Sequence, residues 1–533
     1  MRDYAAGTAE RASLQQALAD LDGAEPTDLT LTIAGEQRLG GGDPIDVVAP
    51  HRHDQVLGRT WQATGAEVEA AVEAAVTAGA EWREVGLEER AAVFLRAADL
   101  LAGPWRDRLN AATMLGQSKT CYQAEIDSAC ELIDFWRFNV DFARSIHEEQ
   151  PQSIPGVRNS FDHRPLEGFV LAITPFNFTA IAGNLPTAPA LMGVPVVWKP
   201  SPTQGLAAHL TMRLLEEAGL PPGVINLVTG DGAAVSEVAL VDPRMSGVHF
   251  TGSTPTFRRI WRSVADHLDG YRDYPRLVGE TGGKDFVVAH RSADVDALRV
   301  ALVRGAFEYQ GQKCSAASRA FIPSSLWSSL REDLVETVRA VTMGDPTDFS
   351  VFMGAVIDRR AFDRLASAIE RARSEPSITV LAGGGTDDRT GYFVEPTLLV
   401  GTDPTDDVFT SELFGPILAV HVYDDASPGD DAFDEVMRLV DQATPYALTG
   451  SIFAQDPAAV ARASARLRYA AGNFYVNDKP TGAVVGQQPF GGARASGTDD
   501  KAGSAYNLLR WTSPRVVKAT ERPPTEWRYP HQD

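Results

Sequence analysis

Of the three cysteines in the chain, Cys314 alone lies in a setting suited to nucleophilic chemistry. It follows the polar, glycine-containing segment 310–313 at the end of an apolar helical pattern, and the last residue of that segment is Lys313. A neighbouring cation would favour the thiolate, which is the reactive form of cysteine. Cys130 has apolar residues at helical spacing on both sides and is predicted to lie in the core, and Cys121 has no distinctive neighbours. Cys314 is therefore the candidate nucleophile.

A candidate base and a candidate amide donor accompany this thiol. Glu280 ends a strand-like stretch and is followed by Thr281 and two glycines, which let a backbone or a ligand approach closely. Asn177 comes directly after the buried strand-like stretch 169–174. Taken singly, Glu280 fits a surface turn equally well, and Asn177 fits a turn or a cap. A cysteine hydrolase would need a histidine base held by a third group, and none of the ten histidines lies in such a motif.

The composition excludes several classes of protein. The 533 residues are 44% hydrophobic and 23% charged, which is typical of a globular protein with a large core. The formal net charge of −22 disfavours a nucleic-acid partner and an anionic membrane surface. Three cysteines cannot form a disulfide framework, and the first thirty residues lack a basic segment followed by an apolar one. We therefore expect a cytoplasmic protein without a signal peptide, a membrane anchor or a metal site.

The elements that would position these residues alternate between strand and helix. Residues 65–102 have helical periodicity. The uncharged stretch 168–198 is long enough to cross a bilayer, but its four prolines and its asparagines exclude a membrane helix. We predict instead a strand, a short helix near 185–192 and a second strand at 194–198. Further strands at 224–228, 248–251 and 286–289, with helices such as 207–218 between them, predict a doubly wound parallel sheet.

A second α/β lobe is predicted to start near residue 287. Its helices are expected near 297–309 and 325–342, and its strands at 392–400, 417–423 and 449–453. Residues 152–163 predict an exposed hairpin, and residues 511–519 a late strand. Because uncovered strand edges invite pairing, both are candidates for contact with another subunit.

Seven motifs resemble, in order, those of the aldehyde dehydrogenase superfamily over nearly the whole chain. Each motif alone is weak evidence for the family, but a chance match of all seven in the same order is negligible. The motifs are Pro175-Phe176-Asn177-Phe178, Trp198-Lys199-Pro200-Ser201, Phe250-Thr251-Gly252-Ser253-Thr254, Glu280-Thr281-Gly282-Gly283-Lys284, Gly311-Gln312-Lys313-Cys314, Glu412-Leu413-Phe414-Gly415-Pro416 and Pro489-Phe490-Gly491-Gly492.

The resemblance implies the α/β class and the aldehyde dehydrogenase fold, with a Rossmann-like NAD-binding domain, an α/β catalytic domain and a small β oligomerisation element. It also implies a homo-oligomer, either a dimer or an assembly of dimers. The expected boundaries are 1–150 and 165–286 for the NAD-binding domain, 287–480 for the catalytic domain, 151–164 and 508–533 for the oligomerisation hairpin and strand, and 481–507 for a substrate-anchoring loop that returns to the NAD-binding lobe.

The same resemblance assigns catalytic roles. Cys314 would attack the aldehyde carbonyl to form a thiohemiacetal, while the Asn177 amide and the Cys314 backbone N–H hold the oxyanion. After hydride transfer to the nicotinamide, Glu280 would activate a water that hydrolyses the thioester. Lys199 and Glu412 would bind ribose hydroxyls of NAD. The other expected cofactor-binding residues are Phe414 beside the nicotinamide, Gly252, Ser253, Thr254, Pro255 and Thr256 at the pyrophosphate, and Thr174, Pro175, Phe176 and Gly282.

One departure concerns the choice of cofactor. Pro202 stands where many NAD-preferring relatives carry a glutamate on the adenine ribose, so NADP is an alternative cofactor.

Within the superfamily the chain most resembles the 1-pyrroline-5-carboxylate dehydrogenase branch. The features that carry this are the run 177–181, Thr281 after Glu280, Ser315 after the cysteine, and the long loop 477–492. They imply NAD-dependent oxidation of L-glutamate 5-semialdehyde, in equilibrium with 1-pyrroline-5-carboxylate, to L-glutamate in the second step of proline degradation. Ser315, Gly482 and Ala483 would hold the substrate α-carboxylate, and Phe178 and Phe490 would clamp its aliphatic chain.

Glu131 is a further substrate-binding candidate. It shares a helical face with Phe135, Phe138 and Phe142, and the opposite face is also apolar. A carboxylate packed on two sides needs a partner. Two alternatives follow: a buried structural ion pair, or a position by the substrate pocket near the α-ammonium group.

Two other functions are weighed against this one. Another semialdehyde dehydrogenase of the same fold would share the motifs, whereas a catalytically silent binding member would have no need of Cys314, Glu280 and Asn177 together. The motifs run from residue 175 to about 497 and leave no room for a fused proline dehydrogenase. We therefore expect functional coupling to a separate proline dehydrogenase, by contact or by diffusion.

Overall fold

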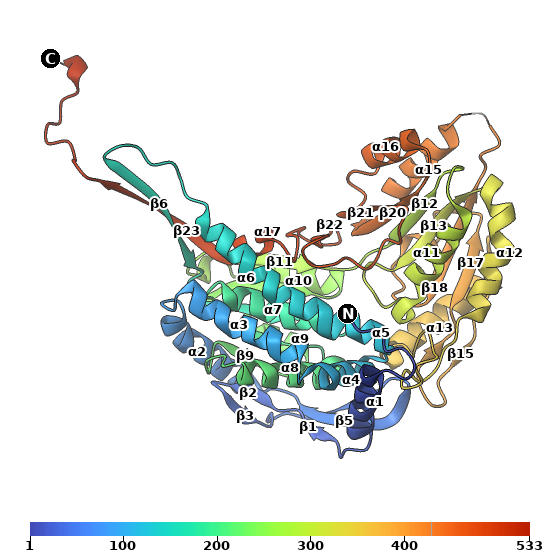
Figure 1. Cartoon of the computed structure of the whole chain (residues 1–533), viewed down its shortest axis with the longest axis horizontal. Helices are drawn as coiled ribbons and strands as arrows, with labels where there is room; N and C mark the ends of the chain where they lie inside the picture. The colour runs from blue at the N-terminus through green and yellow to red at the C-terminus, as the bar shows by residue number, and fades with distance from the viewer. Residues whose placement is uncertain (428, 533) are drawn as a thin grey trace.

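The computed structural model describes residues 1–427 and 429–532 and contains two large sheets in two lobes (Figure 1). The first sheet has seven strands in the order β11-β10-β7-β8-β9-β2-β3. Its central pairs are parallel, and the short β2–β3 hairpin closes one edge in antiparallel fashion. The strands are β2 (Leu31–Ile33), β3 (Glu36–Arg38), β7 (Phe169–Ile173), β8 (Val196–Lys199), β9 (Ile225–Leu227), β10 (Met245–Thr251) and β11 (Arg276–Glu280).

Helices cover both faces of the first sheet, as expected for a doubly wound fold. Helix α2 (Gly65–Trp82) starts at a capping box formed by Thr64 and Glu67, and its buried Val68 and Val72 face the core. The others are α1 (Ala9–Asp22), α3 (Leu87–Ala102), α4 (Arg106–Gln117), α5 (Cys121–Ala124), the π-helical turn η1 (Glu125–Glu131), α6 (Leu132–Glu148), α7 (Thr179–Leu191), η2 (Pro202–Gln204), α8 (Gly205–Glu217), α9 (Gly232–Ala239), α10 (Thr254–Asp266) and η3 (Leu268–Gly270). A small sheet, β1 (Thr27–Asp28), β5 (Arg52–Trp61) and β4 (Pro44–Ala49), flanks this lobe.

Helix α7 starts at Thr179, earlier than the short helix predicted near 185–192, and it contains both Pro186 and Pro189. A proline removes one N–H from the helical ladder and so frees the carbonyl four residues earlier. For Pro189 that carbonyl belongs to Leu185, and the buried His249 ring lies 2.9 Å from it through Nδ1. A tertiary hydrogen bond thus replaces the missing helical one, which local sequence patterns do not reveal.

The second sheet has the order β14-β17-β18-β13-β12-β20-β21. Its strands are β12 (Asp285–Ala289), β13 (Ala317–Pro323), β14 (Ile378–Ala382), β17 (Thr397–Gly401), β18 (Ile417–Tyr423), β20 (Thr449–Phe453) and β21 (Asn473–Val476). Its helices are α11 (Val295–Phe307), η4 (Glu308–Gly311), α12 (Ser324–Ala340), α13 (Arg359–Ser374), α14 (Asp407–Thr410), α15 (Asp431–Gln442) and α16 (Pro457–Arg466). Short pairs β15 (Thr386–Asp387) with β16 (Phe393–Val394) and β19 (Tyr446–Ala447) with β22 (Ala493–Arg494) complete the lobe.

The strand predicted at 286–289 does not belong to the first sheet. It is β12, which pairs in parallel with β13 and β20 near the middle of the second sheet. A continuous apolar strand fits the interior of either sheet, so its composition could not decide between them. The chain therefore changes lobes between Glu280 and Asp285, and the candidate base lies at this crossing.

Within residues 152–163 the predicted hairpin is reduced to a short antiparallel bridge between Ile154 and Val157. Strand β6 (Val157–Pro165) pairs in antiparallel fashion with β23 (Thr512–Thr520), and the pair extends from the body of the molecule as an arm (Figure 1). The short helices α17 (Ala505–Leu509) and η5 (Pro530–Gln532) lie on either side of β23 in the chain. Among the described residues, no helix combines the length and the apolar character needed to span a membrane.

Candidate active site

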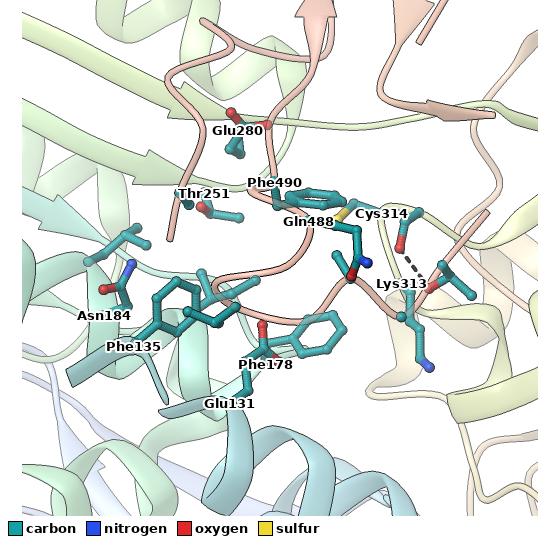
Figure 2. Close-up of a pocket in the computed structure, with 18 of the residues that line it drawn as sticks. Glu131, Phe135, Phe178, Asn184, Thr251, Glu280, Lys313, Cys314, Gln488 and Phe490 are labelled. Atoms are coloured by element: carbon teal, nitrogen blue, oxygen red, sulfur yellow. Dashed lines mark hydrogen bonds between the residues drawn. The ribbon is translucent and has the colours of Figure 1, made fainter. Parts of the chain in front are cut away.

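Cys314 lines two cavities, one on each side of the loop that carries it. The first cavity lies between the lobes and also contains Glu280 (Figure 2). The second contains Gly283, Glu412 and Phe414. A reactive sulfur at the junction of two cavities can meet two different molecules, one from each side.

The loop before Cys314 has an unusual backbone. Tyr309, Gln310 and Gly311 are consecutive left-handed residues with φ of 53°, 54° and 64°. Such conformations are disfavoured for residues with a side chain and persist only where the surroundings hold them. The Gln310 amide supplies part of that support, because Nε2 donates to Ser118 O at 3.0 Å and to Ala355 O at 2.8 Å. The turn directs Cys314 out of the core and into the cavity.

The structure brings Asn177 to this loop. The Asn177 side chain is buried, and its Nδ2 donates to Gln312 O at 3.0 Å, two residues before Cys314. An amide nitrogen carries two N–H groups. One is engaged by Gln312, which leaves the other for an oxyanion formed at Cys314.

The expected effect of Lys313 on the thiol is wrong. The Lys313 side chain points away from the Cys314 sulfur (Figure 2), and its Nζ lies 3.2 Å from Glu308 Oε2. Burial raises the pKa of the Cys314 thiol well above 9, and the nearby carboxylates of Asp285 and Glu280 raise it further. The adjacent cation therefore does not activate the thiol, which rests in its neutral form.

Glu280 ends strand β11 and faces the first cavity. Its Oε2 accepts a hydrogen bond from Gly492 N at 2.9 Å. Burial raises the pKa of Glu280 well above 4.5. A buried carboxyl with a raised pKa is suited to act as a base near neutral pH, as general acid–base catalysis requires.

Residues of the second cavity, together with Lys199, which lines neither cavity, suit a dinucleotide. Gly283 N donates to Glu412 Oε1 at 2.9 Å, and a Cβ on Gly282 would fall 2.3 Å from Glu412 Oε2, so only glycine leaves this carboxylate in place. Lys199 is buried at the end of β8, and a Cβ on Gly232 would lie 3.5 Å from its Nζ. A buried ammonium and a carboxylate are suited to ribose hydroxyls.

The remaining cofactor candidates lie near these groups without lining either cavity. Phe176 contacts Phe414 edge to face, with ring centroids 5.8 Å apart. Ser253 caps α10 at its N-terminus. Thr174 and Thr254 are engaged in hydrogen bonds to Trp198 and Thr281. The N-terminus of α10 is free to face a phosphate group.

All six substrate-binding candidates line the first cavity: Glu131, Phe178, Ser315, Gly482, Ala483 and Phe490. Ser315 Oγ lies 2.8 Å from Thr481 Oγ1, which ties the nucleophile loop to the 481–507 loop (Figure 2). Gly482 has φ of 92°, a left-handed conformation that a glycine adopts without strain.

Lys479, which lines the first cavity, was missed as a candidate substrate contact. Lys479 Nζ lies 2.8 Å from Glu308 Oε2, the same oxygen that binds Lys313, and Lys479 is within 3.4 Å of a Cβ built on Gly482. One carboxylate thus faces two cations, which leaves a local positive excess beside the predicted carboxylate site. The position of Lys479, three residues before Gly482, was the available signal.

Glu131 lies in the wall of the first cavity (Figure 2). Burial raises the pKa of Glu131 to about 8, and Asp127 raises it further while Lys119 and Lys313 oppose the rise. Both lysines are paired elsewhere, Lys119 with Asp127 and Lys313 with Glu308. This arrangement favours the substrate-facing alternative for Glu131 over a structural ion pair.

Cys130 is not a core residue. It is half-buried in the π-helical turn η1, with its sulfur 3.5 Å from Arg106 Nη2 and from Glu125 Oε1. The π-helical turn shifts the residues that follow relative to the regular helix that the sequence pattern assumes.

A buried ion pair supports the site from behind. Lys119 Nζ lies 2.6 Å from Asp127 Oδ2, and both side chains are 1% exposed. The Asp127 carboxylate also accepts from the backbone N–H groups of Thr179 and Ala180 at 2.9 and 2.8 Å and so caps α7 directly after Phe178. Lys119 Nζ is 4.3 Å from the centre of the Phe178 ring.

Asp127→Ala is expected to lower the free energy of unfolding by about 3–5 kcal/mol, because it leaves a buried lysine without its partner. Chemical denaturation followed by circular dichroism measures the change. Asp46→Ala, which removes an ion pair with Arg59 that is 47% exposed on both sides, is the matched control and should change it by less than about 1 kcal/mol. An equal effect of the two substitutions would contradict the assignment.

A thiol nucleophile, an amide donor beside it, a buried carboxyl across the cavity and a dinucleotide-type site on the far side together define a dehydrogenase that works through a cysteine adduct. The sequence comparisons agree: the chain belongs to the aldehyde dehydrogenase family, whose model matches residues 39–517. The mitochondrial delta-1-pyrroline-5-carboxylate dehydrogenase of Bos taurus is 49% identical to it over 529 residues, covering 99% of this chain and 93% of the relative.

Solved structures give the same result. The delta-pyrroline-5-carboxylate dehydrogenase of Mycobacterium tuberculosis, solved with bound NAD, is 60% identical and superposes with a TM-score of 0.95 over 100% of this chain and 97% of that one. Proline utilization A of Bdellovibrio bacteriovorus is 31% identical, with a TM-score of 0.90 over 97% of this chain and 53% of its own.

Proposed function

We propose that this enzyme oxidises L-glutamate 5-semialdehyde to L-glutamate with NAD, the second step of proline degradation. The observation that carries the proposal is the position of Cys314 between two cavities. The first cavity contains the base Glu280 and, at one end, lysines and hydrogen-bond donors that suit an amino acid. The second cavity fits the nicotinamide end of a dinucleotide. The names of the relatives, and the NAD bound to the mycobacterial structure, support the same substrate and cofactor.

The chemistry starts at the Cys314 sulfur. Its thiolate bonds to the aldehyde carbon, and the carbonyl oxygen takes up the negative charge of the thiohemiacetal. The second N–H of Asn177 and the backbone N–H of Cys314 donate to this oxygen. Because burial disfavours the thiolate, the thiol must give its proton to a water molecule as the reaction begins, so the rate should rise with pH.

When bound, NAD supplies the nicotinamide that accepts a hydride from the substrate carbon, which leaves a thioester on Cys314. Lys199 and Glu412 would hold its ribose hydroxyls, and Phe414 would flank the nicotinamide. Glu280 then removes a proton from the attacking water. The carbon–sulfur bond breaks, and glutamate leaves as the carboxylate.

The far end of the first cavity selects the substrate. Ser315 and the backbone N–H groups at Gly482 and Ala483 bind the α-carboxylate, and Lys479 adds a positive charge beside them. Phe178 and Phe490 contact the methylene groups. Glu131 provides a carboxylate for the α-ammonium group.

Lys479→Met is expected to raise KM for glutamate semialdehyde by about ten-fold or more while leaving kcat nearly unchanged, since a charge-assisted contact made equally in ground and transition states is lost. Initial rates with glutamate semialdehyde, succinic semialdehyde and hexanal measure this, with Arg331→Met on the exposed face of α12 as control. KM for hexanal should not change. A wild-type preference for succinic semialdehyde or hexanal would overturn the substrate assignment, and the same assay with NADP tests the cofactor.

The arm formed by β6 and β23 supports a homo-oligomer, a dimer or an assembly of dimers. Its Val516 is 62% exposed, and Ile154, which bridges to Val157 at the start of β6, is 59% exposed; both suit a contact with a second copy. The likeness to proline utilization A supports coupling to a separate proline dehydrogenase. The oxidation-sensitive thiol of Cys314 supports a reducing location, the cytoplasm.

A further inference from the structure

The loop 491–501 wraps around the general base. Thr281 N donates to Ser496 O at 2.8 Å and Thr498 N to Gly279 O at 2.9 Å, so the loop runs beside the end of β11 on both sides of Glu280. Gly492 N donates to Glu280 Oε2, and a Cβ on Gly491 would lie 3.2 Å from Glu280 Oε1. Both carboxylate oxygens therefore face the peptide group that joins residues 491 and 492.

Lys501 binds the opposite side of that same peptide group. Its Nζ donates to Gly491 O at 3.1 Å and to Gly472 O at 2.8 Å, and it lies 2.8 Å from Asp499 Oδ1. A cation on the carbonyl oxygen polarises the peptide and strengthens its N–H as a donor. The charge of Lys501 thus reaches Glu280 through one peptide group.

The backbone is bent to bring this lysine inward. Asp499 and Lys501 have φ of 56° and 50°, in the left-handed region that residues with side chains seldom occupy. The Lys501 side chain is 24% exposed, and its ammonium is directed at two carbonyl oxygens. A lysine whose only role was to keep the surface soluble would need neither the left-handed backbone nor the contacts with two carbonyl oxygens.

We propose that Lys501 is a positioning residue, which holds the Glu280 carboxylate in its ionised, water-activating state through the 491–492 peptide. The proposal rests on the general-base role of Glu280 in the proposed function. It adds a second group on which thioester hydrolysis depends, although Lys501 touches neither the substrate nor the cofactor.

Charged groups of opposite sign surround Glu280. Besides burial, which raises the pKa of Glu280, Asp499 and Asp500 raise it, whereas the Gly492 hydrogen bond and Lys501 lower it. The Cys314 thiol faces Glu280 across the cavity. Removing the lysine should therefore move the pKa of Glu280 upward, and removing the aspartate should move it downward.

Lys501→Met tests the first direction. The rate of thioester hydrolysis, measured by acid quench of the radiolabelled acyl-enzyme at a series of pH values, should fall about five-fold near pH 7, with the pH midpoint of its acid limb about 0.5–1 unit higher. The rate of acyl-enzyme formation and KM for the aldehyde should not change. Lys501→Arg, which keeps the charge and the donors, should restore most of the rate.

Asp499→Asn tests the second direction and does not depend on Lys501→Met folding. It should move the midpoint to lower pH. Unshifted midpoints, shifts in the same direction for both variants, or a pH-independent loss that arginine does not restore would each overturn the proposal. Glu280→Gln distinguishes failure of the base assignment from failure of the Lys501 proposal. If this variant hydrolyses the thioester at the wild-type rate, Glu280 is not the base. If it abolishes hydrolysis while the Lys501 and Asp499 variants have no effect, only the role of Lys501 is wrong.

Discussion

Cys314→Ala is expected to lower kcat for aldehyde oxidation by about 10⁴-fold or more, because no other group in the cavity can form the covalent adduct that the reaction needs. The sulfur lies at the junction of the two cavities, so alanine removes the atom that would hold the substrate there. NADH formation, followed by absorbance with glutamate semialdehyde, measures the loss. The variant should retain its fold, since the side chain is only half-buried.

Cys121→Ala is the matched control. Cys121 is also half-buried, but it lies at the start of α5 and lines neither cavity. Turnover should be close to that of the wild type. If the Cys314 variant keeps substantial turnover, or if the Cys121 variant loses as much, the covalent mechanism is wrong.

Glu280→Gln is expected to slow thioester hydrolysis by about 10²–10⁴-fold, the usual contribution of a general base. Glutamine keeps the shape of the side chain and an oxygen that accepts from Gly492 N, so the loop should remain in place. The acyl-enzyme should then accumulate, and NADH should appear as one rapid equivalent per active site followed by a slow phase. Rapid mixing with acid quench resolves the two phases.

The pH dependence of wild-type hydrolysis follows from the same carboxyl. A base must be ionised, so the rate is lost as pH falls through the pKa of Glu280 and reaches a plateau above it. Because burial raises this pKa, the midpoint should lie well above 4.5. A rate that is independent of pH from 4.5 to 8, or a Glu280→Gln variant that lacks the rapid phase as well, would place the role of Glu280 in an earlier step.

The order of elements was largely predictable because apolar periodicity is local. Helices α2, α11 and α12 and strands β18 and β20 lie close to their predicted ranges. The errors arose where distant residues intervene. Helix α7 keeps two prolines, one of whose freed carbonyls is satisfied by His249, and β12 joins the second sheet although its composition suits either.

The candidate site was predictable to a different extent. Local residue patterns pointed to Cys314, Glu280 and Glu131, and motif resemblance supplied the other five substrate-binding candidates; all of them line the first cavity. The resemblance did not include Lys479, although this lysine stands only three residues before Gly482, because the motif itself does not contain it. The supposed activation of Cys314 by Lys313 failed because neighbours in sequence need not point in the same direction.

The sequence by itself therefore determined the family, the nucleophile and the order of the motifs, because these depend on residue types and spacing along the chain. Only the tertiary structure decided the electrostatics of the site. It directs Lys313 and Lys479 to Glu308, leaves Cys314 as a neutral thiol and connects Lys501 to Glu280 through one peptide group. Charge interactions depend on distance and burial in space, and the folding of remote segments sets both.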